Sequence, residues 1–508
     1  MPRGSGAAID GNVFSPVPAA RRLVLSLVRR QGVSIAAVAF AGCMVGPAYA
    51  PPKAPVAKAW TAESGGAAHA GARIAPAWWT SFGDPALGRL VALARQENLS
   101  LQAAALRVVQ ARARRAIAVG NLFPQQQEVT GSYTRSRRSA NLAGAGSVAG
   151  STEGSGAGAA SGAGRSTDSW STGLDAAWEV DLWGKYRRSI EAADAELLAA
   201  RASHDDVLVS LLAEVATTYV RVRSLEERLA VAADNVEAQR DSLSIARVRF
   251  EAGGTSELDV QQAKALLHDT EARIPDLQIQ RRQAVNSLSV LLGRPPATLD
   301  DLLGPPGRVP KVPPTVAVGI PADLLRRRPD VRRAEHAAAA QSARIGVATA
   351  ELYPSFQLTG SIGLSADEAA QLIEGRSFEA LGGPAFRWPV LNYGRLVNNV
   401  RLQDATFQEL ATQYRNTVLV AQREVEDALV GYLRGSEQVE SLSQSVAAAN
   451  RAVEISLVQY REGATDYTSI LNAQQAKLRE DDLLVSTRAA VALSVVGLYR
   501  ALGGGWER

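Results

Sequence analysis

Few residues in this chain of 508 have the type and spacing that covalent chemistry needs. The four histidines are far apart and there is one cysteine, which argues against a disulfide framework, a cysteine cluster and a histidine-rich zinc centre. The glycine-rich stretches lack the Lys-Ser/Thr of a phosphate loop. The acidic pair Glu226–Glu227 is expected to be solvated. We therefore predict no catalytic residue, no metal and no cofactor, apart from a covalent lipid on Cys43.

Cys43 follows a segment with the composition of a secretory signal. The apolar stretch 32–42 follows Arg21, Arg22, Arg29 and Arg30 and is too short to span a bilayer as a helix. Phe40-Ala41-Gly42-Cys43 is similar to a bacterial lipobox, which predicts that residues 1–42 are removed and that Cys43 is acylated. Cleavage after Ala48-Tyr49-Ala50 is the alternative. Residues 1–20 are either a true extension or the result of a misplaced start codon.

The charge of the chain lies mostly in that segment. Five arginines and one aspartate precede residue 43, so 50 basic and 50 acidic residues follow it, out of 55 and 51. A neutral body argues against nucleic-acid binding through bulk charge.

The body is a tandem duplication. Three pairs of segments match at an offset of about 210 residues: Trp178–Lys185 with Trp388–Arg395, Arg249–Thr255 with Gln459–Thr465, and Leu288–Gly293 with Leu498–Gly503. Asn121–Pro124 matches Glu351–Pro354 about 230 residues later, so the first copy has extra residues, which we assign to the Gly/Ala/Ser tract 139–166, a flexible loop. We predict a lipidated segment at 43–80, repeat 1 at 81–303, a linker at 304–322 and repeat 2 at 323–508.

Each repeat contains two segments with the period of a β-strand. Apolar and polar residues alternate along 170–182 and 355–364, and less regularly along 125–137 and 378–391. Each segment is near the roughly 9–11 residues of a tilted membrane strand, and the apolar side is aromatic at its end, as at a membrane interface. A soluble sandwich with one wet face is the alternative, although four strands in so long a chain would make a poor one.

Each repeat also contains a long helical hairpin. Residues 185–252 include neither Gly nor Pro, and a continuous helix of that length measures about 100 Å. Gly253 and Gly254 form the turn, and the chain returns over 255–292, bent or broken near Pro275. In repeat 2 the helix 395–462 turns at Gly463 and returns over 464–496.

These elements imply that several chains share one barrel. No segment of the exported body is predicted to be a spanning helix, and strands can enter a membrane only in a closed barrel. Four strands cannot close one, and two chains would give eight strands, too narrow for a water-filled pore. Three chains would give twelve strands above a helical tube. The predicted fold class is thus a mixed α/β membrane protein.

At this point the sequence resembles the TolC/OprM-like outer-membrane efflux channel family, and within it the NodT-type RND efflux outer-membrane lipoproteins. The resemblance rests on Cys43–Tyr49, Trp78–Pro85, Ile320–Glu335 and Ala343–Ser355 and runs from about Cys43 to Gly504. It implies a homotrimer in the cell outer membrane with a twelve-stranded barrel and a periplasmic helical tunnel. It also implies a periplasmic adaptor and an inner-membrane RND-type pump as partners.

The expected function is passive conduction of solutes out of the cell, with the hairpin tips as the periplasmic aperture. Candidate aperture residues are Glu257 and Asp259 in the first tip, and Asp466, Tyr467, Thr468, Ser469 and Asn472 in the second. A trimer repeats each side chain three times, so a carboxylate becomes a ring of charge that filters ions, and clustered carboxylates raise one another's pKa. The resemblance places Asp259 at a family aspartate, whereas Ser469 and Asn472 replace carboxylates. The alternative is that these are ordinary solvated turn residues.

Two other functions fit the same sequence. One is the outer-membrane conduit of a type I protein secretion system, because the inner-membrane partner selects the cargo. The other is a periplasmic coiled-coil structural protein without a barrel.

Overall fold

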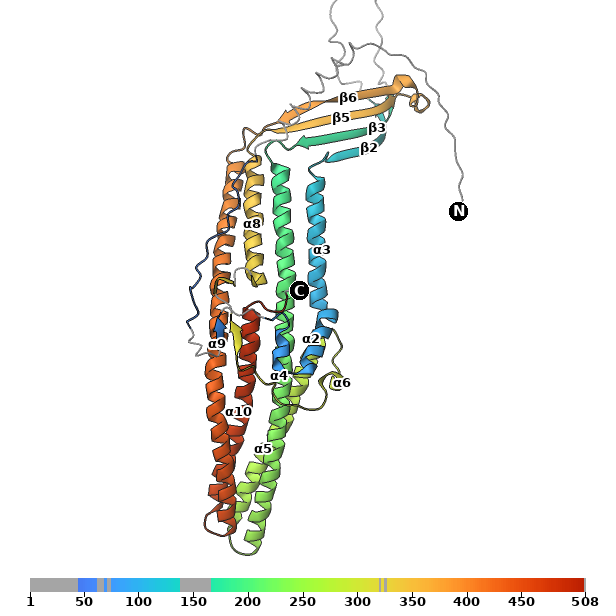
Figure 1. Ribbon diagram of the computed structural model, residues 1–508. Helices are drawn as coiled ribbons and strands as arrows, with labels where there is room; N and C mark the ends of the chain where they lie inside the picture. The colour runs from blue at the N-terminus through green and yellow to red at the C-terminus, as the bar shows by residue number, and fades with distance from the viewer. Residues whose placement is uncertain are drawn as a thin grey trace, which may run out of the picture. The chain divides into compact units, whose positions relative to one another are not determined.

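The computed structural model describes residues 44–61, 68–70, 75–137, 166–318, 321–323 and 327–506. The signal segment, Cys43 and nearly all of the Gly/Ala/Ser tract lie outside these residues. The elements occur in the order β1 (Ala68–Ala70), η1 (Trp78–Phe82), α2 (Pro85–Glu97), α3 (Leu99–Gly120), β2 (Gln126–Arg137), β3 (Ser166–Val180), α4 (Lys185–Glu251), α5 (Glu257–Leu291), α6 (Asp300–Leu303), β4 (Val316–Val318), η2 (Pro321–Asp323), α8 (Pro329–Ala350), β5 (Ser355–Ala366), η3 (Ala369–Gln371), η4 (Gly375–Ser377), β6 (Phe378–Arg387), α9 (Arg395–Arg461) and α10 (Tyr467–Ala501). Figure 1 labels the α-helices and the four strands of the larger sheet.

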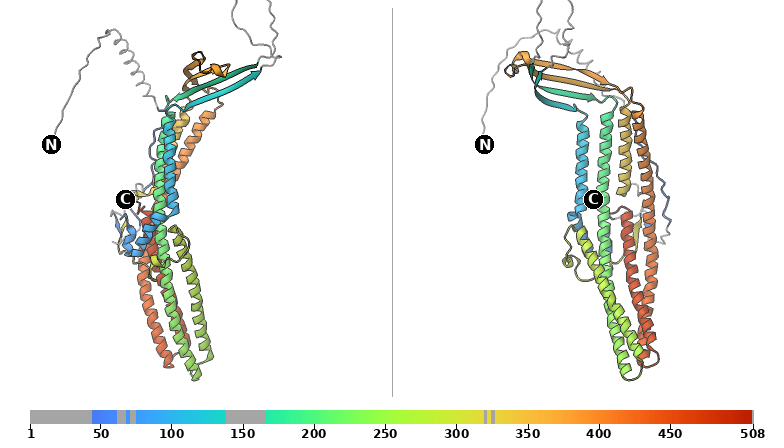
Figure 2. Two further views of the ribbon diagram at one scale, coloured as in Figure 1. Left: turned by 90° about the vertical axis from the view of Figure 1, so that its right-hand side faces the viewer. Right: turned by 180° about the vertical axis from the view of Figure 1, so that it is seen from behind.

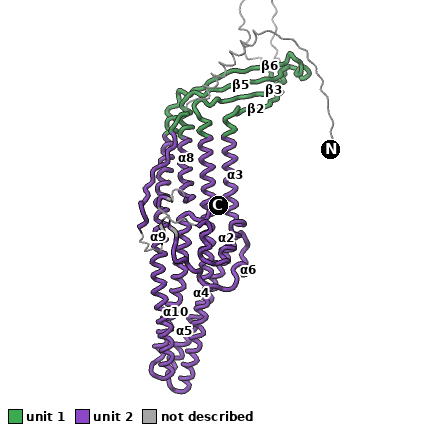
Figure 3. Tube along the Cα trace, in the orientation of Figure 1, with its two compact units in different colours: residues 1–47, 119–189, 345–400 green, residues 48–118, 190–344, 401–508 purple. Residues whose placement is uncertain are grey.

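The chain divides into two compact units, shown in Figure 3. Unit 1 comprises residues 1–47, 119–189 and 345–400 and holds the four-stranded sheet. Unit 2 comprises residues 48–118, 190–344 and 401–508 and holds both helical hairpins.

The sheet of unit 1 has the strand order β2-β3-β5-β6, and each neighbouring pair is antiparallel. Val129, Leu174, Ile362 and Ala380 lie opposite one another along one row across the sheet. All four predicted strands are confirmed. β3 begins earlier than predicted, at Ser166, and β6 ends earlier, at Arg387.

The long helices of unit 2 form the two predicted hairpins. α4 and α9 each have 67 residues, and each is followed by an antiparallel helix of 35 residues, α5 and α10 (Figures 1 and 2). Of the predicted bend or break near Pro275, the break is wrong, since α5 continues from Glu257 to Leu291 with this proline inside it, and the bend stays a prediction. α10 extends further than predicted, to Ala501, because the Ala- and Val-rich end of the chain packs in the main core.

The returning helices end against the beginnings of shorter helices. In repeat 1 the Asn98 amide, between α2 and α3, donates to the Leu291 carbonyl at the end of α5 over 2.9 Å. In repeat 2 the Arg328 guanidinium, just before α8, donates to the Ala501 carbonyl at the end of α10 over 2.8 Å. In both repeats, therefore, a hydrogen bond to the last carbonyl of the returning helix connects that helix to the start of a shorter one.

One described helix, α10, is apolar and long enough to cross a membrane by its length and composition. Sequence analysis predicted none. The buried core helix of a soluble protein satisfies the same criterion, and 56% of the apolar stretch of α10 is buried. Its Val495, Val496 and Leu498 belong to the main core.

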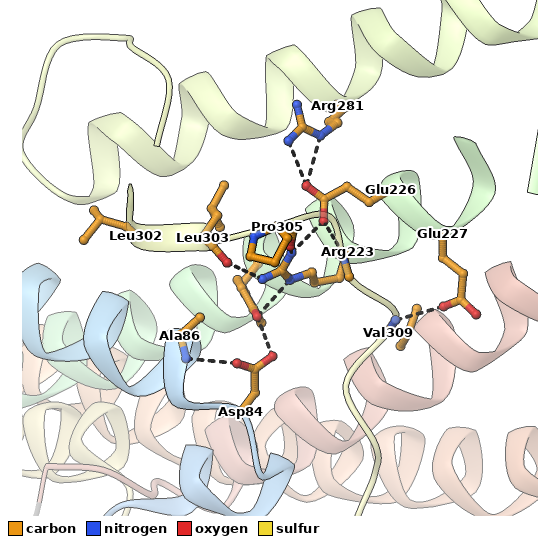
Figure 4. A network of polar contacts seen from close by, with 12 residues as sticks. Asp84, Ala86, Arg223, Glu226, Glu227, Arg281, Leu302, Leu303, Pro305 and Val309 are labelled. Carbon is orange, nitrogen blue, oxygen red and sulfur yellow. Dashed lines mark hydrogen bonds and ion pairs between the residues drawn. The ribbon is translucent and has the colours of Figure 1, made fainter. Parts of the chain in front are cut away.

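A buried polar network fixes the linker to α4 (Figure 4). The Arg223 side chain is 5% exposed. It donates to the Glu226 carboxylate at 2.7 Å and to the carbonyl oxygens of Leu303 and Pro305 at 2.5 and 3.0 Å. Glu226 also accepts from Arg281 at 2.8 Å. A guanidinium with this many acceptors is a stable way to bury charge.

The same network corrects one prediction. Glu226 and Glu227 are buried, not solvated. Their carboxylates accept the backbone N–H groups of Gly307 and Val309 at 3.0 and 2.9 Å, so the acidic pair holds the linker in place.

Candidate functional site

One face of the sheet is apolar and carries aromatic side chains near both ends. The register places even residues of β3, β5 and β6 and odd residues of β2 on this face. The aromatic residues form two groups, Tyr133, Trp170 and Phe378 toward one end and Trp178, Phe356 and Phe386 toward the other. Trp170 and Trp178 are eight positions apart in β3, or about 26 Å. On a strand tilted by about 35–45° this length spans about 18–21 Å across the membrane, slightly less than the roughly 25 Å apolar band of a membrane barrel.

The other face is polar. Along β5 it carries Gln357, Thr359 and Ser361, and along β3 it carries Asp175 and Glu179. Carboxylates face one another where Glu128 of β2 lies opposite Asp175, and Asp175 accepts a hydrogen bond from the Thr130 hydroxyl at 2.9 Å. Such a face suits contact with water.

Both edges of this sheet are open in the described residues. β2 and β6 each pair with only one neighbour, and every residue of both strands is exposed. The exposed residues include large apolar side chains, Val129 and Phe386 among them. An apolar sheet with two unpaired edges cannot lie in hydrocarbon as it stands, because its edge N–H and C=O groups would lack partners.

Two indoles fasten the strands to the helices that precede them. The Trp178 N–H donates to the Leu122 carbonyl after α3, and the Trp388 N–H donates to the Leu352 carbonyl after α8, each at 3.1 Å. The duplicated tryptophans thus have the same structural role in both repeats.

The two hairpin tips have the same backbone structure. Gly253 and Gly463 have φ values of 73° and 74°, which favour glycine. The N–H groups of Gly254 and Ala464 donate to the carbonyls of Arg249 and Gln459, both at 2.8 Å. These are Schellman turns, which satisfy the last carbonyls of a helix. The predicted turn residues Gly253, Gly254 and Gly463 lie in these two turns.

A polar cluster joins the two tips, and we call Arg249, Thr255, Asp259 and Tyr460 the tip latch. The Tyr460 hydroxyl of α9 donates to the Asp259 carboxylate of α5 at 3.1 Å, and the Thr255 hydroxyl donates to the same oxygen. The Arg249 guanidinium lies over the Tyr460 ring, 4.3 Å from its centroid, and donates to the Tyr460 carbonyl. Burial raises the pKa of the Tyr460 hydroxyl, which keeps it a donor.

The predicted aperture residues differ in how exposed they are to solvent. Glu257, Asp466, Thr468 and Asn472 are exposed, and Asp259 and Ser469 are half-buried.

Tyr467 is 1% exposed and packs edge-on against Tyr460, with 5.6 Å between ring centroids. It belongs to the core between the hairpins. Sequence analysis missed Arg249 and Tyr460, although both lie in the matched segments 249–255 and 459–465.

Further from the tips, polar side chains cross the interface between the hairpins. The Gln474 amide donates to the Ser242 hydroxyl at 2.5 Å, and Arg228 binds Asp482 through two hydrogen bonds of 2.6 and 3.1 Å. Within the described ranges, no group of three or more His, Cys, Asp or Glu side chains could hold a metal ion.

Comparison with known proteins places these features in a family. The outer membrane efflux protein model matches residues 90–294 and 320–504, which are the two repeats. Nodulation protein T of Rhizobium leguminosarum bv. trifolii is 31% identical over 455 residues, which cover 89% of this chain and 91% of the relative. The toluene efflux pump outer membrane protein TtgF of Pseudomonas putida is 31% identical over 481 residues, which cover 92% and 95%.

A solved structure of the outer-membrane channel OprN is 31% identical to this chain, with a TM-score of 0.81. The match covers 91% of this chain and all of the OprN chain. The duplicated strands and hairpins, the two-sided sheet and the matched family model lead to one conclusion: this chain belongs to the outer membrane efflux protein family.

Proposed function

We propose that three copies of this chain close one twelve-stranded barrel in the outer membrane and conduct solutes through it. The observation that carries this proposal is the four-stranded sheet, which has one apolar face, one polar face and two open edges. Because the four strands alternate in direction, β6 of one copy is antiparallel to β2 of the next, so closure continues the same pairing. Twelve strands enclose water, whereas eight are filled by side chains.

The helices also present surfaces for neighbouring copies. α3 exposes four large aliphatic side chains on unit 2, and α9 exposes a second series. These residues are Leu99, Leu106, Val109 and Ile117 on α3, and Leu402, Leu419, Val430, Ile455 and Val458 on α9. We assign these exposed aliphatic side chains to contacts between copies, because such contacts would remove them from water.

The channel acts by conduction alone, without a covalent step. Relatives carry names such as toluene efflux pump outer membrane protein, which supports a place in an efflux system. Energy would come from an inner-membrane RND-type pump, linked to the hairpin tips by a periplasmic adaptor. A type I secretion system would use the same conduit for proteins, and the cargo follows from the partner.

The tip latch would hold the periplasmic aperture closed within each copy. It joins α9 to α5 through the Tyr460–Asp259 bond, so moving one hairpin away from the other requires breaking it. In a trimer the exposed Glu257 and Asp466 would form charged rings at the mouth, where they would favour cations.

The residues that follow a lipid on Cys43 lie at the end of the sheet where β3 ends. The next residue, Met44, packs against Gly184, and the Val45 N–H donates to the Trp183 carbonyl at 3.1 Å. Trp178, in the aromatic group at that end, lies only a few residues away in β3. Acyl chains starting there would enter the same membrane leaflet as that group.

The test is reconstitution of the purified, detergent-extracted protein into planar bilayers, with its mass measured in parallel. A trimer that conducts ions supports the proposal. A conducting monomer, or a protein that mild salt releases from the membrane fraction, would refute it. Pull-down of an RND-type pump or of a type I secretion transporter then distinguishes efflux from protein secretion.

A further inference from the structure

In the sheet, the two repeats of one chain meet at the pairing of β3 with β5, which we call the inner seam. Val180 of β3 lies opposite Phe356 of β5. Beside this pair, the Trp183 ring stacks on the Tyr353 ring with 4.7 Å between centroids, and its N–H donates to the Pro354 carbonyl at 2.8 Å. The inner seam thus joins the end of one strand to the helix–strand turn of the other repeat.

The duplication supplies a second set of the same parts at the two outer edges. Tyr393 follows β6 as Trp183 follows β3, and Phe123 precedes β2 as Tyr353 precedes β5. The turns are alike, since the N–H of Phe123 and the N–H of Tyr353 each donate to a carbonyl three residues earlier at 3.2 Å. Trp183 and Tyr353 contact each other, whereas Tyr393 is 99% exposed and Phe123 is 60% exposed.

Tyr393 also has an unusual backbone conformation. Its φ of 52° is the only positive value for a non-glycine residue in the described part of the chain. Side chains with a Cβ adopt this region at a cost, and such strain persists where a contact uses it. A bulky ring held out in solvent by a strained residue is poorly explained within one copy.

We propose that neighbouring copies form an outer seam that repeats the inner seam, with Tyr393 packed on Phe123 of the next copy. This inference rests on the proposed trimer and names the contacts that close it. In this outer seam β6 pairs with β2 of the next copy as β3 pairs with β5. The contact between the Tyr393 and Phe123 rings lies beside the end of β6 and the start of β2.

The inner seam also fixes the register of the outer one. Leu174 pairs with Val129 in repeat 1, and its equivalent Pro384 pairs with Leu358 in repeat 2, so strand pairing makes Val129 equivalent to Leu358. This offset is one residue less than that between Phe123 and Tyr353, so repeat 1 has one extra residue between Phe123 and Val129. Trp178 lies opposite Leu358 across the inner seam. Trp388 therefore lies opposite Val129 of the next copy.

Two residues further along, Phe386 lies opposite Gly131 of the next copy. In this register the apolar faces of both strands are on the same side, as a membrane wall requires.

Cysteine cross-linking tests the register in the full-length protein, whose only natural cysteine is Cys43. We expect the double variant Phe386→Cys with Gly131→Cys to form a disulfide-linked trimer on oxidation. The control is Phe386→Cys with Arg135→Cys, four positions away on the same face, which is too far for a disulfide. Cross-linking of the control pair alone, or of neither pair in a conducting trimer, would overturn the outer seam. Absence of any trimer would instead overturn the proposed function.

A second measurement tests the ring contact. We expect Tyr393→Ser to speed thermal dissociation of the detergent-extracted trimer at least tenfold. Tyr393→Phe, which keeps the ring, should dissociate at the unmodified rate. The double variant Tyr393→Ser with Phe123→Ser should dissociate no faster than either single variant. Ile373→Ser is the control, since Ile373 is also highly exposed and lies outside the seam. Equal rates for Tyr393→Ser and Ile373→Ser would overturn the contact.

Discussion

Removing one hydroxyl group from the tip latch should open the periplasmic aperture. Tyr460→Phe deletes the donor that binds the Asp259 carboxylate at 3.1 Å. It keeps the ring, so the edge-on contact with Tyr467 and the Arg249 contact over the ring are retained. Core packing should therefore be unchanged, and only the bond between hairpins is lost.

The size of the effect follows from the kind of bond. A hydrogen bond to a charged group contributes about 1.5–3 kcal/mol, and the half-buried position of Asp259 favours the lower end, about 1.5 kcal/mol. If the three copies open together, the closed state loses about 4–5 kcal/mol. The open-to-closed ratio then rises by about a thousandfold, since each 1.4 kcal/mol is a factor of ten.

Single-channel recording in planar bilayers measures this change directly. We expect Tyr460→Phe and Asp259→Ala to raise the open probability to similar extents, and the double variant to add little, because both remove the same bond. Thr465→Val is the matched control. Thr465 bonds Ser469 at 2.8 Å in the equivalent place of the second tip, but this bond lies within one hairpin. A double variant whose effect is the sum of the two single effects would refute the latch, as would a Thr465→Val channel that opens as readily.

Three further predictions concern other parts of the chain. Arg223→Met should destabilise the folded protein by about 3–5 kcal/mol in thermal unfolding, because it leaves the buried Glu226 with one partner fewer. The control is Arg434→Met, in an exposed ion pair, which should change stability by less than about 1 kcal/mol. Burial, and then Asp330, raise the pKa of Asp206, so the folded state binds this proton more tightly than the unfolded state. The folded state therefore loses stability as the pH rises from the ordinary pKa of an aspartate to this raised pKa. Asp206→Asn should raise the unfolding temperature at pH 8 but not at low pH. Cys43→Ser should abolish labelling by a radioactive fatty acid while export continues, and unchanged labelling would exclude acylation at this residue.

The internal duplication made most of the fold predictable from sequence. Matching segments at one offset located both hairpin turns at Gly253 and Gly463, and alternation located the four strands. The errors arose where distant residues decide the structure. Glu226 has the appearance of a surface charge paired with Arg223, three residues earlier on the same helix, and nothing local in the sequence indicates that Arg281 and the linker cover it.

The candidate site was predictable only in part, for a similar reason. Position in a turn suggested that all tip residues face the aperture. Tyr467 begins α10, yet its ring lies against Tyr460 because the two hairpins pack together there. The latch depends on contacts between α9 and α5, which are 201 positions apart at the Tyr460–Asp259 bond. Such a separation leaves no periodic pattern along the chain.

The duplication also explains why there is one latch in each copy. Tyr460 is equivalent to Phe250, and Asp259 is equivalent to Ser469, so the second repeat supplies the donor and the first supplies the acceptor. Phe250 and Ser469 carry neither a phenol nor a carboxylate. If the outer seam repeats the inner one at the tips as well, Phe250 of one copy lies near Ser469 of the next.

Restoring both groups should therefore create a latch between copies. We expect Phe250→Tyr with Ser469→Asp to lower the open probability of the channel, because three new bonds would resist the separation of neighbouring hairpins. Each single variant should have little effect, since it supplies only a donor or only an acceptor. A double variant that conducts like the unmodified channel, in a trimer of unchanged stability, would show that the duplicated tips do not meet between copies as they do within one.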